Sequence, residues 1–115
     1  MNQKELKNET IKNYSFLTGM YSDAYFPNVL VDKVKDILLT FCKEIEEQEP
    51  ANLDELYKLS HAATDQINDL EEAFYEAGSE IETAARDTIG MDFEFIANTY
   101  NFDADVEMLI ATRDW

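Results

Sequence analysis

The spacing of apolar residues predicts a long helix in the first half of the chain. After residue 27, apolar side chains recur at steps of three and four positions, which is the period of one face of an α-helix. Pro27 is tolerated in a first turn because its missing N–H would have no helical partner, and Pro50 lies beyond the end. We therefore expect a helix over about residues 28–48. Its apolar face comprises Val31, Val34, Leu38, Phe41, Cys42 and Ile45.

The next periodic segment predicts a second helix that continues to about residue 77. Asn52 can cap its first turn, and Asp54 and Glu55 follow where the positive end of the helix dipole favours acidic side chains. Gly78 is expected to end the helix, because glycine readily adopts the left-handed conformation common at helix C-termini. The apolar face comprises Leu53, Leu56, Leu59, Ala63, Ile67, Leu70 and Phe74.

A capping pattern predicts where a third helix starts. Ser79 is followed three residues later by Glu82, which is the spacing of a capping box. The helix is expected to continue to about residue 100 unless Gly90 interrupts it, with Ile81, Ala85, Ile89, Ile96 and Tyr100 inward. Asp103 can cap a last short helix whose inward residues are Val106, Leu109 and Ile110.

The segment before the long helix is aromatic and has no sustained helical period. Its apolar residues are Tyr14, Phe16, Leu17, Met20, Tyr21, Tyr25 and Phe26. We expect a short helix or irregular loop packed across one end of the bundle, in preference to a ligand pocket. The polar residues 1–13 are expected as an arm or frayed helix. No strand alternation is present, so the sequence predicts an all-α, single-domain bundle of about four main helices over residues 14–115.

Composition agrees with one globular domain. The chain has 115 residues, of which 45% are apolar and 30% charged. Cys42 is the only cysteine, so an intrachain disulfide and a multi-cysteine metal site are both excluded, and its place on an apolar face indicates a core residue. No apolar run resembles a secretory signal or approaches the ~20 residues of a membrane span. We expect a cytoplasmic protein with no membrane partner and no cofactor.

The negative charge is segregated along the chain. The net charge is −16, yet residues 1–43 carry six lysines against five acidic residues. Residues 44–107 carry 19 acidic residues against only Lys58 and Arg86. Such a field repels nucleic acid and anionic lipid and speeds encounter with a basic protein. Solubility alone is the simpler interpretation of the same charge.

His61 lies on a polar stripe of the second helix. At 100° per residue, the stripe falls within about 40° of one line and contains Asp54, Tyr57, His61, Asp65, Asn68 and Glu72. His61 and Asp65, one turn apart, are candidates for a metal site or an acid–base pair, but three or four ligands are usual for zinc. A His61–Asp65 hydrogen bond on a solvated or partner-facing surface needs fewer assumptions.

Asp92 is the other candidate for chemistry. In an unbroken third helix it would project into the core between Ala85 and Ile96, which is costly for a carboxylate without partners. We favour the alternative that Gly90 breaks the helix and that Asp92 caps its continuation. If Asp92 instead lies in the interior, paired with Arg86, Arg113 or a tyrosine, it becomes the best site residue of the chain.

Several blocks of the sequence resemble a family of small acidic bacterial proteins that is known only as a domain of unknown function. They are "NYSFLTGMYSDAYFP", "LSHAATDQINDLEEAF", "GSEIETAARDTI", "DFEFIA" and "LIATRDW". The resemblance extends from about residue 13 to 115. It implies a bacterial, stand-alone, single-domain protein, and it implies no activity or catalytic residue.

Three functions are consistent with these observations. The first is a non-enzymatic module for a basic protein partner, as immunity or inhibitor proteins are for cationic nucleases. Its contacts are expected from Asp54, Tyr57, His61, Asp65, Asp69 and Glu72. The second is a small metal-binding protein or enzyme that uses His61 with nearby carboxylates. The third is a homo-oligomeric structural protein, and the sequence leaves a monomer and a small homo-oligomer open. Widely spaced glycines exclude a phosphate-binding glycine loop, and no EF-hand loop is present.

Overall fold

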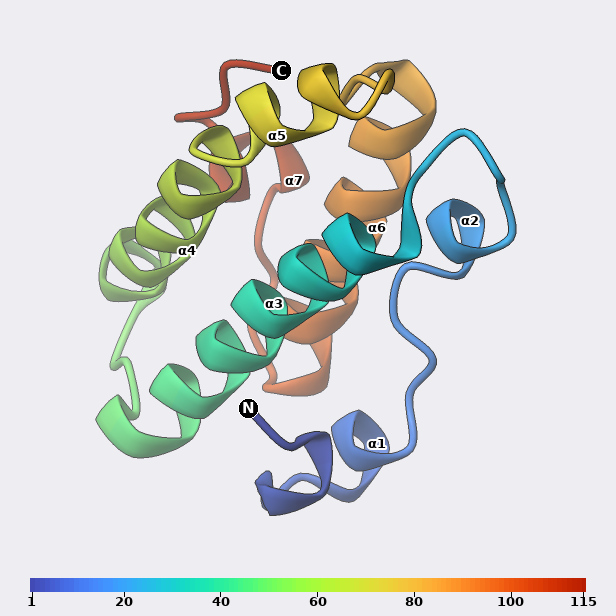
Figure 1. The fold of residues 1–115 in the computed structure, drawn as a ribbon. Helices are drawn as coiled ribbons and strands as arrows, with labels where there is room; N and C mark the ends of the chain where they lie inside the picture. The colour runs from blue at the N-terminus through green and yellow to red at the C-terminus, as the bar shows by residue number, and fades with distance from the viewer.

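The protein is all-helical. A computed structural model describes residues 1–115 and contains no strand, which confirms the predicted fold class. Figure 1 shows the course of the chain. The elements are a 3₁₀ helix, η1 (Gln3–Glu5), and seven α-helices, α1 (Glu9–Lys12), α2 (Thr18–Tyr21), α3 (Asn28–Gln48), α4 (Leu53–Asn68), α5 (Glu71–Glu76), α6 (Thr83–Thr99) and α7 (Val106–Leu109).

One continuous apolar core joins these helices. In Figure 1, α3 crosses the middle of the molecule, α4 lies along one side of it and α6 passes behind it. The short helix α7 packs between α4 and α6, while α2 covers α6 and α3 from the other side. The largest fully buried side chains include Phe26, Phe41, Phe74 and Phe93. None of the helices combines the length and apolar character that crossing a bilayer requires.

The long helix predicted from periodicity is α3, with the expected bounds. Its predicted apolar face is buried throughout, and Cys42 lies in the core. Glu49, just past the end, adopts a left-handed conformation with φ 47° and donates its N–H to the Ile45 carbonyl. The strong amphipathic period of this segment is therefore sufficient to predict the helix and its ends.

The predicted second helix is divided into α4 and α5. The Asn52 cap is confirmed, since its side chain accepts the Glu55 N–H at 3.0 Å. The helix ends at Asn68, where a tighter bond from the Leu70 N–H to the Ile67 carbonyl (2.9 Å) turns the chain. The side chain of Asn68 is bonded to the C-terminal segment, so contacts with a distant part of the chain accompany the end of α4.

The predicted capping box at Ser79 is wrong, because Ser79 ends α5 instead of starting α6. Gly78 has φ +79°, its N–H bonds the Tyr75 carbonyl, and the Ser79 N–H bonds the Phe74 carbonyl at 2.8 Å. These two bonds define a Schellman C-cap, which confirms that Gly78 terminates the helix. The Ser79 hydroxyl is buried without a hydrogen-bond partner, and α6 begins only at Thr83 after Glu82, whose side chain makes no capping bond.

Gly90 does not interrupt α6. It is buried, and a Cβ atom at this position would lie 3.3 Å from a Val106 methyl and 3.6 Å from an Ile110 methyl. The glycine therefore lets α7 pack directly against α6. Asp105, not the predicted Asp103, caps α7 by accepting the Glu107 N–H at 3.0 Å.

The aromatic N-terminal segment packs across α6 and α3. Its buried side chains are Phe16, Leu17, Met20 and Phe26, and α2 forms its centre. Residues 1–13, expected as an arm or frayed helix, form η1 and α1 and add Leu6 and Ile11 to the core.

Candidate functional site

The polar stripe of α4 holds the C-terminal segment. His61 Nε2 lies 2.7 Å from the Met108 carbonyl, and the Tyr57 hydroxyl accepts the Asp105 N–H at 3.2 Å. Two turns beyond His61, Asn68 donates to the Thr112 carbonyl and accepts the Asp114 N–H, both at 3.0 Å. These bonds run from side chains of α4 to the main chain of residues 105–114. His61 is thus part of a packing interface within the chain.

This geometry fixes one proton of the imidazole. A carbonyl oxygen can only accept a hydrogen bond, so His61 Nε2 must carry a hydrogen. No hydrogen bond joins His61 to Asp65, and the predicted bond between them is wrong. Asp65 is exposed to solvent while His61 is half-buried beneath the C-terminal segment.

The predicted partner-binding residues fall into two groups. Tyr57 and His61 are half-buried and engaged within the chain. The carboxylates Asp54, Asp65, Asp69 and Glu72 are exposed, and none forms an ion pair. Nowhere do three His, Cys, Asp or Glu side chains come together as potential metal ligands.

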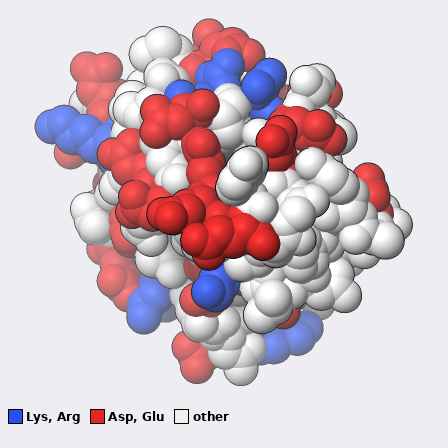
Figure 2. Space-filling model, turned by 45° about the horizontal axis from the view of Figure 1, so that its top comes forward, with Lys and Arg blue, Asp and Glu red and all other residues white.

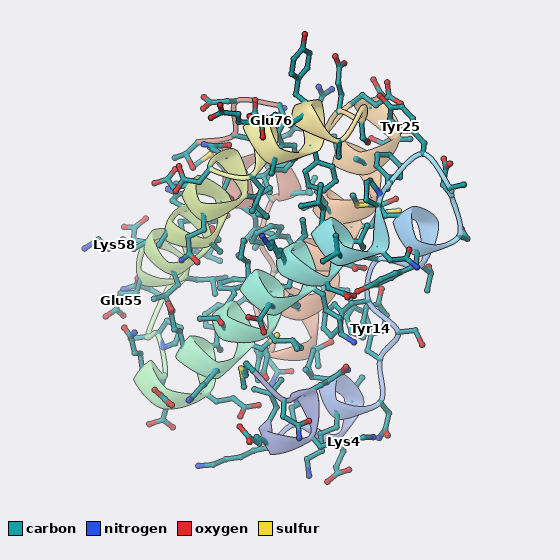
Figure 3. All side chains as sticks on the ribbon, viewed as in Figure 1. Lys4, Tyr14, Tyr25, Glu55, Lys58 and Glu76 are labelled. Atoms are coloured by element: carbon teal, nitrogen blue, oxygen red, sulfur yellow. The ribbon has the colours of Figure 1, made fainter.

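Asp92 lies in the interior, so the favoured cap interpretation is wrong. The alternative of an interior carboxylate paired with a tyrosine describes it. Asp92 is 4% exposed and accepts two hydrogen bonds, from the Tyr14 hydroxyl at 2.6 Å and from the Leu17 N–H at 2.7 Å. Figure 3 shows Tyr14 where the N-terminal segment meets the helices behind it. The helix remains unbroken because these donors, 75 and 78 residues away in sequence, satisfy the carboxylate.

Burial dominates the electrostatics of this pair. Desolvation raises the pKa of Asp92 above its ordinary value, although the hydrogen bonds from Tyr14 and Leu17 oppose the shift. Burial and the neighbouring carboxylate also raise the pKa of the Tyr14 phenol beyond its usual range. No lysine or arginine forms an ion pair with Asp92. Tyr14 additionally stacks on Phe95, with ring centroids 3.9 Å apart. The pair therefore attaches the aromatic segment to α6.

Glu46 is a second anchoring carboxylate, and sequence reasoning missed it. It accepts the N–H groups of Lys7 (2.8 Å) and Asn8 (3.1 Å) and the hydroxyl of Tyr100. Partial burial raises its pKa, but the hydrogen bonds from Tyr100, Lys7 and Asn8 outweigh that effect and leave the pKa below its ordinary value. Its position one turn after Cys42, at the edge of the apolar face of α3, is the signal that could have identified it.

Most of the remaining acidic residues of the segment 44–107 face solvent, while Glu44 and Glu71 are half-buried. Of its 19 acidic residues, fifteen are exposed, and among those fifteen only Glu47 and Glu107 form ion pairs, with Lys43 and Arg113. Figure 2 shows a band of acidic side chains across one face of the molecule, beside a broad area without charged residues. In Figure 3, Glu55 and Lys58 point outward from α4. The molecule thus presents a largely unneutralised acidic surface.

Comparison with known proteins identifies a family without assigning an activity. No curated protein and no solved structure matches the chain significantly. One family model, described as a family of unknown function (DUF5713), matches residues 10–115. The match includes Tyr14, Leu17 and Asp92 as well as the α4 stripe and the C-terminal segment that it holds. Since it covers nearly the whole chain, the protein belongs to the DUF5713 family.

Proposed function

We propose that this protein is a non-enzymatic binding module whose acidic surface holds a basic protein partner. The observation that supports this function is the number of exposed carboxylates on residues 44–107 that form no ion pair within the molecule. A basic partner would relieve the mutual repulsion of these charges, and complementary potentials would speed its association.

The proposed setting is the bacterial cytoplasm. A chain with one cysteine, buried in the core, needs no oxidising environment for its stability. In this setting the closest functional analogy is an immunity or inhibitor protein that neutralises a cationic enzyme. The proposal assigns no catalytic role to the two anchoring carboxylates, Asp92 and Glu46, because both are bonded to groups of the same chain.

The test is affinity capture from a bacterial lysate with washes at two salt concentrations. We expect a basic protein to be retained at ~0.05 M salt and released at ~1 M, where charges are screened beyond about 3 Å. An unrelated helical protein of similar net charge serves as the control for non-specific adsorption. Retention of the same partner in molar salt would contradict the proposal.

The two alternatives gain no support from the contacts. A metal site at His61 and Asp65 would have to use Nδ1, because Nε2 is bonded to the Met108 carbonyl, and no third His, Cys, Asp or Glu side chain joins the two as a potential ligand. Homo-oligomerisation through the stripe would compete with the C-terminal segment, which occupies Tyr57, His61 and Asn68. Elemental analysis and light scattering test these alternatives directly.

A further inference from the structure

A groove lies between α6 and α7, within the acidic part of the chain. It encloses about 300 Å³, and Gly90, Val106 and Ile110 contribute to its lining. It exists because the buried Gly90 admits α7 so close to α6 that the two helices meet along a shallow seam. Three hydrophobic residues in its lining, Met91, Val106 and Ile110, distinguish it from an ordinary cluster of surface carboxylates.

Two methionines are exposed on the helices that form the groove. Met91, which lines it, is 69% exposed, and Met108 on α7 is 45% exposed. Exposed methionines are adaptable apolar contacts, because the unbranched thioether can fit partners of different shape. Methionine is enriched in the cores of protein interfaces, where a few well-packed side chains dominate the binding energy, whereas surrounding charges contribute specificity and association rate.

The exposed charges of the groove that lack an ion-pair partner are two carboxylates. Asp87 and Glu94 line it from α6, are exposed and form no ion pair. They are two helical turns apart, or about 10.5 Å along the axis. Glu107 on the opposite side is bonded to Arg113 at 3.1 Å, and Arg86 is half-buried, with Nε bonded to the Trp115 main-chain oxygen.

We infer that this groove receives an amphipathic helical segment of the basic partner. The segment would carry lysine or arginine residues two turns apart, facing Asp87 and Glu94, and an apolar residue between them, facing Met91 and the floor of the groove. This inference rests on the proposed function and locates its binding site. The exposed carboxylates of α4 and of its C-cap, such as Asp65 and Asp69, then attract the partner from a distance without contacting it.

The site can be located with methyl NMR. The chain has four methionines, so selective ¹³C-methyl labelling gives four probes, at Met1, Met20, Met91 and Met108. The ligand is a synthetic helical peptide with lysines two turns apart and leucines between them. We expect the methyl signal of Met91, which lines the groove, to shift on titration, while those of the buried Met20 and of Met1 stay in place. Shifts restricted to Met1, Met20 or Met108 would overturn the inference.

Matched variants separate the groove from the rest of the acidic surface. Asp87→Lys with Glu94→Lys changes the net charge as much as Asp65→Lys with Asp69→Lys, and all four side chains are exposed on helices or at a helix end. We expect the first pair to weaken binding of the peptide at least tenfold more than the second. Met91→Ala, which changes no charge, is expected to weaken it about fivefold.

The outcomes distinguish the inference from the proposed function. Equal weakening by the two pairs of variants, with no effect of Met91→Ala, overturns the groove as the binding site and leaves the acidic binding module in place. The proposed function itself fails on a different result, the retention of the partner in molar salt.

Discussion

At the scale of single residues, Asp92 is the one charged side chain buried in the interior of the protein. Its carboxylate is buried without a cation and depends on the Tyr14 hydroxyl and the Leu17 N–H. The Leu17 N–H reaches it from a left-handed backbone conformation with φ 56°. The arrangement connects the start of the chain to the middle of α6, and every part of it is needed to satisfy the buried oxygen atoms.

Replacing Asp92 with alanine is expected to lower the free energy of unfolding by about 2–4 kcal/mol, because two donors lose their acceptor and a cavity forms. Urea unfolding measures the change. Tyr14→Phe, which removes one donor and leaves the carboxylate bonded to Leu17, should cost about 1–2 kcal/mol. An Asp92→Ala variant as stable as the exposed control Asp65→Asn would contradict the role of Asp92 as an anchor.

The stability contributed by Asp92 should depend on pH. Its pKa is raised in the folded state, so the folded protein holds this proton to a higher pH than the unfolded chain does. The contribution is fully present below the unfolded pKa of about 3.9 and is lost as pH rises through the folded value. Asp92→Asn cannot ionise, so its stability relative to the native protein should increase from pH 4 to pH 7. Parallel pH profiles of the two proteins would contradict this sign.

His61→Ala is expected to destabilise the protein by about 1 kcal/mol, because the Met108 carbonyl loses its donor. The effect should be local, with faster amide hydrogen exchange in residues 105–114 than in α3. His61→Gln, which retains an N–H donor, is the control and should recover part of the loss. Uniform acceleration across all helices would show that His61 does not act through the C-terminal segment.

At the scale of helices, the close approach of α6 and α7 depends on Gly90. Gly90→Val is expected to lower the free energy of unfolding by about 2 kcal/mol, because the added methyl groups meet Val106 and Ile110. Val106→Ala in the same chain should recover part of this loss, and the non-additivity measured in a double-mutant cycle reports the contact. Strictly additive effects would contradict the packing of α7 on this glycine.

Helices with a strong period of their own could be predicted, and contacts between distant segments could not. The bounds of α3 follow from its apolar spacing and from the prolines beside it. The division between α4 and α5 accompanies bonds from Asn68 to residues 112 and 114, which no local pattern indicates. At Ser79 a capping-box spacing coincides with a Schellman end, and the chain forms the Schellman end.

The same contrast between local pattern and distant contacts applies to the site residues. The helical wheel placed Asp92 toward the core, yet its partners, Tyr14 and Leu17, lie in a segment without periodicity. It also grouped Tyr57, His61 and Asn68 correctly on one stripe of α4. What lies on that stripe is the chain's own C-terminal segment, and a single sequence contains no signal for that pairing.

At the scale of the whole molecule, the anchoring carboxylates are bonded within the fold and most of the others face outward. The protein therefore folds around an apolar core while its acidic residues repel one another across the surface. Added salt screens this repulsion, so the free energy of unfolding should increase from ~0.01 M to ~0.5 M sodium chloride. Urea unfolding at the two concentrations tests the direction, and a decrease would contradict a surface dominated by like charges.

The most direct test of the acidic binding module is the dissociation constant of its captured partner as a function of salt. With exposed carboxylates of residues 44–107 facing a basic surface, affinity should fall about tenfold or more between ~0.05 M and ~0.5 M sodium chloride, mainly through slower association. A dissociation constant that stays the same across this range would contradict the account.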